Sequence, residues 1–203
     1  MAQYRGQKDA LPTTTSRFTS DRERRLWFCA LAVVLAIYST LGLAGSLAEV
    51  LREHHLLPVA LLFLMFLTVA AVVGSGLRTR PGRREIWMGL GVMAVYGMLV
   101  LRMGVSLEER THLFEYGIVG VLIYQALSER SENGRRVPVP AVLALVVTAL
   151  LGWIDEGIQA VLPDRVYDNF DVFSNVIAAL MGIGGSVVIG WGRRWIGGWA
   201  SSR

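Results

Sequence analysis

Long apolar runs alternate with short charged segments over most of the chain. The runs at 26–45 and 56–77 contain no charged residue. About 20 apolar residues, each rising about 1.5 Å along a helix, cross a hydrocarbon core of about 30 Å. The pattern therefore predicts six membrane-spanning helices, at 26–45, 56–77, 86–101, 111–127, 139–162 and 172–191. The third is short, and it spans only if Arg102 extends its charged end toward the interface or the bilayer thins locally.

The composition agrees with this pattern. Of 203 residues, 53% are hydrophobic and 18% are charged, and the mean hydropathy is +0.47. A soluble domain of this size is less apolar and more charged. The single cysteine, Cys29, excludes a disulfide-stapled fold, and glycine lacks the three-residue period of collagen. The sequence therefore predicts an all-α, polytopic membrane helix bundle.

Positive charges fall mainly on one side of the six predicted helices. Sixteen of the 20 lysines and arginines lie in the two tails and in the segments 78–84 and 130–136. Because short cytoplasmic loops accumulate Lys and Arg, both termini are predicted to be cytoplasmic. The basic pI of about 9.6 then reflects topology and requires no nucleic-acid partner. Ten of the 16 acidic residues lie on or near the outer side.

These boundaries divide the chain into four parts. Residues 1–25 are polar and lack periodicity, so they are predicted to form a disordered cytoplasmic tail. Three N-terminal helices occupy 26–107, and a second group of three occupies 108–192. Residues 193–203 are predicted to form a short cytoplasmic C-terminal tail.

Polar side chains recur at helical spacing at the outer ends of the last three predicted helices. Spacings of three and four residues place side chains on one face of a helix. The stripes consist of His112, Glu115 and Tyr116; of Asp155, Glu156 and Gln159; and of Asp171 and Asn175, which follow a loop containing Arg165. Alternating chain direction puts all three stripes at the same level, so they are predicted to line one water-accessible pocket.

Depth distinguishes these residues from ordinary surface residues. Asp155 precedes Pro163 by eight residues, which places it about 12 Å below the helix end. An ionised carboxylate in the bilayer core costs at least about 2.5 kcal/mol, so it must face the bundle interior. One interpretation is an ion-pair network with Arg110 and Arg165 that fixes helix packing. The other is a ligand pocket, in which Glu156 is the candidate acid and His112 the candidate base.

The polar residues do not match a metal or cofactor motif. His112 with Glu115, Asp155 and Glu156 offers nitrogen and oxygen ligands, but the sequence has no HExxH motif and no cysteine ligand nearby. The run GIGG at 182–185 lacks the strand and the GK[ST] tail of a phosphate loop. Together with Ala178, its glycines predict close packing of the last helix on a neighbour. No metal and no cofactor are therefore expected.

The polar segments resemble the VanZ-like family of bacterial membrane proteins, named for an accessory factor in resistance to the glycopeptide teicoplanin. The similar segments are ERTHLFEYGIVGVLIYQAL at 109–127 and GWIDEGIQAVLPDRVYDNFDVFSNVIAALMG at 152–182. They contain the pair His112 and Tyr116, the acidic pair Asp155 and Glu156 with Gln159, the turn with Pro163 and Arg165, and the step from Asp171 to Asn175. The chain has Ala178 where the family often has Gly.

This resemblance covers about a third of the chain. It implies a cell-envelope role at the bacterial plasma membrane and, as for the namesake, lower sensitivity to a lipid-anchored glycopeptide antibiotic. It assigns no reaction, so whether the protein is an enzyme is left open.

The leading hypothesis is that the outer pocket binds a polar lipid head group or an envelope molecule. The alternative is a non-catalytic accessory subunit of a larger membrane complex, with the polar residues serving only internal packing. An ion-coupled carrier is a third reading, but its inverted repeats are not visible in the sequence. The expected partners are therefore membrane lipids or a membrane-protein complex.

Overall fold

The computed structural model describes an all-helical protein. The described residues are 17–41, 44–56, 109–162 and 169–200, with short pieces at 58–60, 62–63, 66–67, 70, 87, 90–91, 94–95 and 97–98. Within them no strand occurs. The helices are α1 (Asp21–Thr40), α2 (Ala44–Glu53), α5 (Glu109–Glu132), α6 (Pro140–Gln159) and α7 (Asn169–Ala200).

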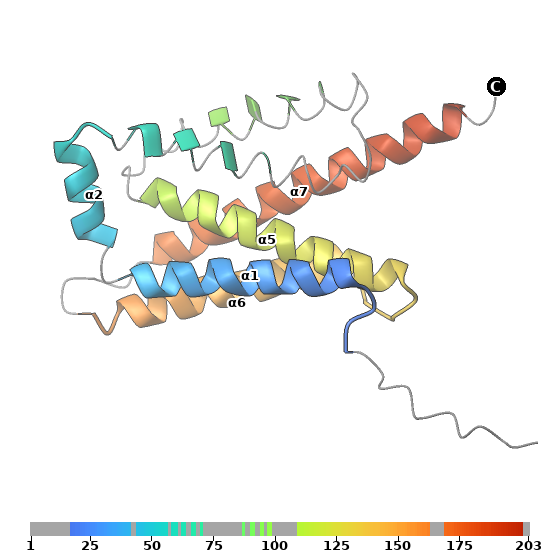
Figure 1. Ribbon diagram of the computed structural model, residues 1–203, viewed down its shortest axis with the longest axis horizontal. Coiled ribbons are helices and arrows are strands. Elements are labelled where there is room, and N and C mark those ends of the chain that lie inside the picture. Colours follow the sequence, from blue (N-terminus) through green and yellow to red (C-terminus); the bar gives the residue numbers. More distant parts are fainter. Residues whose placement is uncertain are drawn as a thin grey trace, which may run out of the picture.

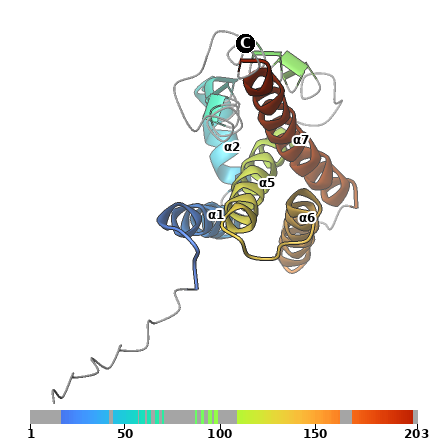
Figure 2. The ribbon, with the colours of Figure 1, turned by 90° about the vertical axis from the view of Figure 1, so that its right-hand side faces the viewer.

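Helix α5 lies at the centre of the bundle and contacts α1, α6 and α7 (Figures 1 and 2). The first turn of α1 is bonded to the last turn of α5, so these two helices are antiparallel. Helices α6 and α7 each reverse the direction of the helix before them (Figure 1). The C-terminal ends of α1 and α6 therefore share one end of the bundle with the starts of α5 and α7. We call it the α2 end, because α2 stands across it, and we call the opposite end the Glu129 end.

Helix α1 begins five residues before the predicted boundary at Leu26. The hydroxyl of Ser20 accepts a hydrogen bond from the backbone N–H of Glu23 at 3.0 Å. In return, the Glu23 carboxylate accepts bonds from the backbone N–H and the hydroxyl of Thr19, at 2.6 and 2.7 Å. This is a variant of the capping box, in which the carboxylate accepts from the residue before the N-cap and the N-cap hydroxyl satisfies an N–H group at the helix start. Residues 21–25 are thus helical, and residues 1–16 of the predicted disordered tail lie outside the described residues.

The first predicted span, 26–45, is divided between two helices. Helix α1 ends at Thr40 and α2 begins at Ala44. In the last turn of α1, the hydroxyls of Ser39 and Thr40 both donate to the carbonyl oxygen of Ala36 at 2.9 Å. Such bonds from side chain to backbone compete with continued helix. Most of α2, from residue 46 on, occupies a segment that the hydropathy pattern left as a loop.

Two of the described helices are long and apolar enough to cross a membrane, by length and composition: Pro140–Gln159 and the part Asn169–Gly192 of α7. They indicate membrane association, but they do not support the predicted six spans. Helix α1 carries charged residues through its first turns, and α5 carries Glu115 and Gln125 within its length. The predicted spans 56–77 and 86–101 lie largely outside the described residues.

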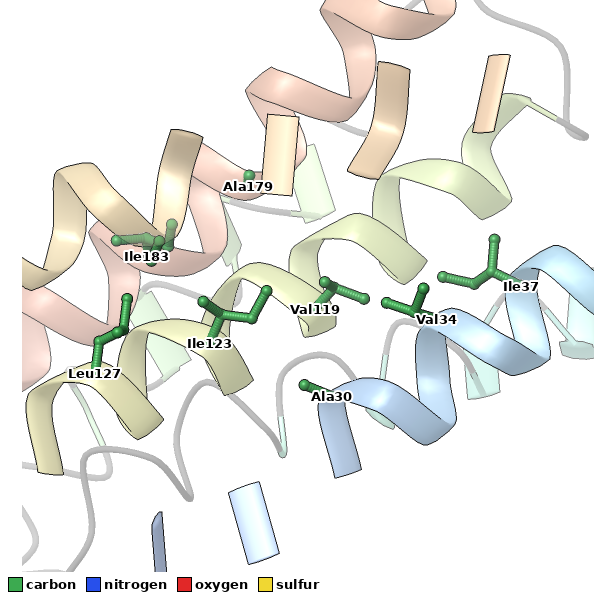
Figure 3. Close-up of a cluster of buried hydrophobic side chains, with 9 residues drawn as sticks. Ala30, Val34, Ile37, Val119, Ile123, Leu127, Ala179 and Ile183 are labelled. Carbon is green, nitrogen blue, oxygen red and sulfur yellow. The ribbon is translucent and has the colours of Figure 1, made fainter. Parts of the chain in front are cut away.

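The apolar core runs along the seam between α1, α5 and α7 (Figure 3). Steps of three and four residues bring one face of each helix inward. The buried residues are Ala30, Val34 and Ile37 of α1, Val119, Ile123 and Leu127 of α5, Ala144 of α6, and Ala179 and Ile183 of α7. This seam fixes the rotation of the helices, and hence which polar residues face inward at each end.

Small residues allow α5 and α7 to approach closely. A Cβ placed on Gly182 would lie 2.6 Å from the carbonyl oxygen of Gly117, and one on Gly120 would lie 3.3 Å from the Cα of Ala179. The predicted close packing of the last helix is therefore confirmed at Gly182. Close backbone approach through small residues is typical of helix pairs in membranes.

Candidate functional site

The inward face of α6 changes from apolar to polar toward the α2 end. Its buried residues are Ala144, Thr148, Gly152, Asp155, Glu156 and Gln159. Their spacing follows the helical repeat, so Asp155, Glu156 and Gln159 continue the buried face toward the α2 end. Asp155 and Glu156 are 0% exposed, and Gln159 is 2% exposed. The packing of the bundle thus brings two consecutive carboxyl groups into its interior.

Two tyrosine hydroxyls reach the backbone of α6 beside Asp155. Tyr38 of α1 donates to the carbonyl oxygen of Leu151 at 2.8 Å, and the buried Tyr116 of α5 donates to the same atom at 3.4 Å. Leu151 lies one turn before Asp155, which is close to both phenol groups. Three helices therefore meet at this level. Sequence reasoning identified Tyr116 but missed Tyr38, whose only signal is its place beside the inward stripe of α1.

Helix α7 contributes Ser174 and Asn175 to the same region. Both are buried, at 3% and 1% exposed. A Cβ placed on Gly152 would lie 3.0 Å from the Cβ of Asn175 and 3.2 Å from its Nδ2, so the amide of Asn175 lies directly against α6. About two turns further along α6 than Gly152, Gln159 donates from Nε2 to Oε1 of Glu156 at 3.3 Å.

We call this set the buried polar cluster. Its members are Tyr38, Tyr116, Asp155, Glu156, Gln159, Ser174 and Asn175. Of the residues predicted from sequence, the fold brings Tyr116, Asp155, Glu156, Gln159 and Asn175 to one end of the bundle. In the structure the inner members of the cluster are closed to solvent, whereas the sequence predicted a water-accessible pocket.

The remaining predicted site residues lie at the edge of the cluster or outside the description. Glu115 and Asp171 are half-buried. Because Asn175 faces Gly152 and the helices are antiparallel, Asp171 lies about one turn closer to the α2 end, near the level of Glu156. His112 is in the first turn of α5, but its side chain is outside the described residues, and so is Arg165. The predicted acid and base pair of Glu156 and His112 thus stays a prediction.

A second set of charged residues lies at the Glu129 end. Nη1 of Arg22 lies 2.7 Å from Oε2 of Glu129, and Nη1 of Arg130 lies 3.1 Å from Oε1 of Glu23. Both carboxylates are buried, Glu23 fully. Ser20 also donates to Glu129, at 3.1 Å. Sequence reasoning counted these residues only as cytoplasmic charges, although the Ser-x-x-Glu capping signature at Ser20 was visible.

These contacts change how the two carboxyl groups titrate. Burial raises the pKa of Glu23, but the two hydrogen bonds from Thr19 and the charge of Arg130 outweigh it, so the pKa lies below its ordinary value of 4.5. Burial likewise raises the pKa of Glu129, and bonds from Arg22 and Ser20 outweigh it, so this pKa is also lowered. Both groups therefore remain ionised at neutral pH and hold α1 to α5.

Among the residues that the structure describes, no three His, Cys, Asp or Glu side chains are grouped to hold a metal ion. Comparison of the chain with protein-family models, with curated proteins and with solved structures finds no match.

Proposed function

We propose that the protein is an integral membrane protein of six spans with both termini in the cytoplasm. The distribution of polar and apolar side chains supports this. Large apolar residues are exposed along the helices, among them Phe28 at 59%, Leu150 at 52%, Trp153 at 57% and Phe173 at 59%. Polar residues such as Thr148, Asp155 and Ser186 are buried. Exposed apolar surface of this extent fits a lipid environment, whereas water disfavours it.

Topology is tested by labelling single cysteines in a variant whose only native cysteine is removed by Cys29→Ala. Under the proposal, a cysteine at Glu53 reacts with a membrane-impermeant maleimide in intact cells. A cysteine at Ser131 reacts only after the cells are opened. Labelling of both positions in intact cells would contradict the six-span arrangement.

We further propose that the protein belongs to the VanZ-like family of the bacterial plasma membrane and acts in the cell envelope. In this proposal the α2 end faces outward, and the cluster with Glu115, His112, Asp171 and Arg165 binds a polar head group or envelope molecule. The observation that carries it is the burial of Asp155, Glu156 and Asn175 at one junction of α6 and α7. Ionisable groups at such depth are costly and are kept mainly where they act on a ligand.

The envelope role is tested by expressing the protein in a teicoplanin-sensitive bacterium. The wild type is expected to lower sensitivity, and Glu156→Gln and Asp155→Asn are expected to abolish the effect at equal membrane level. Loss of a charged hydrogen-bonding group weakens binding about tenfold or more. Asp21→Asn is the matched control, because Asp21 is exposed and pairs only with the exposed Arg24 in the described contacts. Full activity of both cluster variants would contradict the proposal.

The closed state of the cluster favours a second candidate. Asp155 and Glu156 without exposed surface also suit a purely structural role, in an accessory subunit of a larger membrane complex. This role predicts a stoichiometric membrane-protein partner after purification in mild detergent. It also predicts that the cluster variants lose thermal stability in proportion to any loss of function.

A further inference from the structure

The Glu129 end carries more arginines than acidic residues. The described segments 17–25 and 129–136 contain seven arginines and four acidic residues, a net charge of +3. Three of the four acids already form ion pairs with arginines of these segments, and the fourth is Glu132. Three further arginines are exposed and form no ion pair within the part of the chain that the structure describes: Arg17, Arg135 and Arg136. Positive charge is thus left over for a partner outside the chain.

A hydrogen bond brings two of these arginines to the same place. The Nδ2 of Asn133 donates to the Oγ1 of Thr19 at 3.1 Å, which joins the turn after α5 to the segment before α1. Arg17 and Arg135 each lie two residues from this bond, so the Cα of each is within about 7 Å of the Cα of the bonded residue on its side. Figure 2, viewed onto this end, shows the start of α1 beside the end of α5. The two arginines therefore flank a single contact.

The turn that carries Arg135 and Arg136 is held on both sides. Helix α5 ends in a Schellman motif, in which the N–H of Arg135 donates to the carbonyl oxygen of Arg130 at 3.2 Å. Gly134 has a φ of 84°, the left-handed conformation that this motif requires. On the other side, Val137 packs against the apolar core. Both arginines therefore extend from a fixed backbone, which lowers the entropy lost when they bind an anion.

An exposed apolar stripe on α1 starts at the same end. It consists of Phe28, Leu31 and Leu35, which are spaced by three and four residues and so share one exposed face of the helix. We call it the α1 stripe. Phe18, the neighbour of Arg17, packs against Phe28 with ring centroids 6.4 Å apart, so Arg17 lies at the head of the stripe. Positive charge beside exposed apolar surface matches an amphiphile with an anionic head group.

We propose that Arg17, Arg135 and Arg136 bind the phosphate of an anionic phospholipid, whose acyl chain lies along the α1 stripe. Guanidinium groups bind phosphate oxygens through paired, charge-assisted hydrogen bonds. In the proposed topology the Glu129 end faces the cytoplasmic leaflet, where basic pockets beside membrane helices bind anionic head groups. The proposal rests on that membrane location and orientation, and it adds a lipid site at the end opposite the buried polar cluster.

The test measures the melting temperature of the purified full-length protein in dodecyl maltoside. Dioleoyl phosphatidylglycerol is titrated against dioleoyl phosphatidylcholine, glycerol 3-phosphate and inorganic phosphate at constant ionic strength. A ligand that binds only the folded state raises the melting temperature in a saturable manner. The wild type is expected to respond to phosphatidylglycerol and not to the other three at equal concentration, because only this lipid combines a net negative head group with acyl chains.

Variants of the exposed arginines isolate the head-group contact. Arg17→Gln, Arg135→Gln and Arg136→Gln are each expected to raise the apparent Kd for phosphatidylglycerol about fivefold, and the triple variant on the order of a hundredfold. Arg52→Gln is the matched control, because it removes the same charge from an exposed position of α2 and is expected to keep the wild-type Kd. The melting temperature without lipid checks that each variant folds. If the triple variant does not fold, the single variants decide.

Four outcomes would overturn the lipid site. Phosphatidylcholine stabilises the wild type as much as phosphatidylglycerol does; or the arginine variants keep the wild-type Kd; or Arg52→Gln raises the Kd as much as Arg135→Gln, which would assign the effect to net charge; or glycerol 3-phosphate or inorganic phosphate stabilises the protein equally, which would assign the arginines to a soluble anion. Failure here is distinguishable from failure of the proposed topology, because cysteine labelling at Glu53 and Ser131 reports orientation without added lipid.

Discussion

The two ends of the bundle bury carboxylates among different neighbours. At the Glu129 end, Glu23 and Glu129 each accept a bond from an arginine of the neighbouring helix. At the α2 end, the described contacts of the buried polar cluster come from tyrosine and amide groups. The first arrangement ties α1 to α5, and breaking one of its pairs leaves a charge without its partner. The second joins buried carboxyl groups to hydroxyl and amide groups of the neighbouring helices at a common junction.

The difference teaches that carboxyl groups are buried among two kinds of neighbour in one small protein. Matched charges at helix ends fix which helices pair. Polar groups gathered within the bundle cost stability unless hydrogen bonds satisfy them. The following three variants or conditions test this contrast, from the largest expected effect to the smallest.

Glu23→Ala is expected to cause the largest loss of stability. It removes the partner of Arg130 and the acceptor of two bonds from Thr19. Breaking a buried ion pair by deleting one partner costs about 3 kcal/mol or more. Asp21→Ala, two residues away, breaks the exposed pair with Arg24, the one ion pair of Asp21 among the described residues, and should cost about 0–1 kcal/mol. Titration with SDS in mixed micelles measures the free energy of unfolding of both variants. Equal losses in the two variants would contradict a special role of the buried pairs at the Glu129 end.

Gly182→Ala tests whether the close packing of α7 on α5, between the two ends, stabilises the bundle. The added Cβ would lie 2.6 Å from a backbone oxygen of α5, which cannot move aside as a flexible side chain could. Overpacking of this kind costs about 1–3 kcal/mol. Gly184→Ala meets no atom within 4 Å and is the matched control. The melting temperatures of both variants are measured in detergent. A Gly182→Ala protein as stable as the control would show that this close approach of α5 and α7 is not needed for stability.

Acidification is expected to weaken the Glu129 end by a smaller amount. The pKa values of Glu23 and Glu129 lie below the ordinary value of 4.5 in the folded protein, so the unfolded chain binds more protons as pH falls. Their stabilising contribution is complete above the ordinary pKa and is lost as pH falls through the lowered folded values. The double variant Glu23→Gln with Glu129→Gln lacks this contribution at every pH. The melting temperature should therefore change less between pH 7 and pH 3 in the variant than in the wild type. An equal change would contradict the role of Glu23 and Glu129 in the pH dependence of stability.

Local patterns in the sequence predicted much of the helical framework. The predicted span 139–162 contains α6, and the predicted spans 111–127 and 172–191 lie within the longer α5 and α7. The predicted positions of the helix ends were less accurate. The start of α1 depends on the cap at Ser20, and its end depends on hydroxyl groups that turn back on the backbone, neither of which hydropathy registers.

The cluster was also partly predictable, since spacing alone put Asp155, Glu156 and Gln159 on one face of α6 and gave Asn175 the same level. Periodicity fixes such faces because the helical repeat is a local property of the backbone. What lies opposite each face was decided only by packing in three dimensions. Tyr38 reaches Leu151 across 113 positions of sequence, and Arg22 reaches Glu129 across 107. These pairings depend on the rotation and offset of whole helices, which close contacts such as that of Gly182 with Gly117 set.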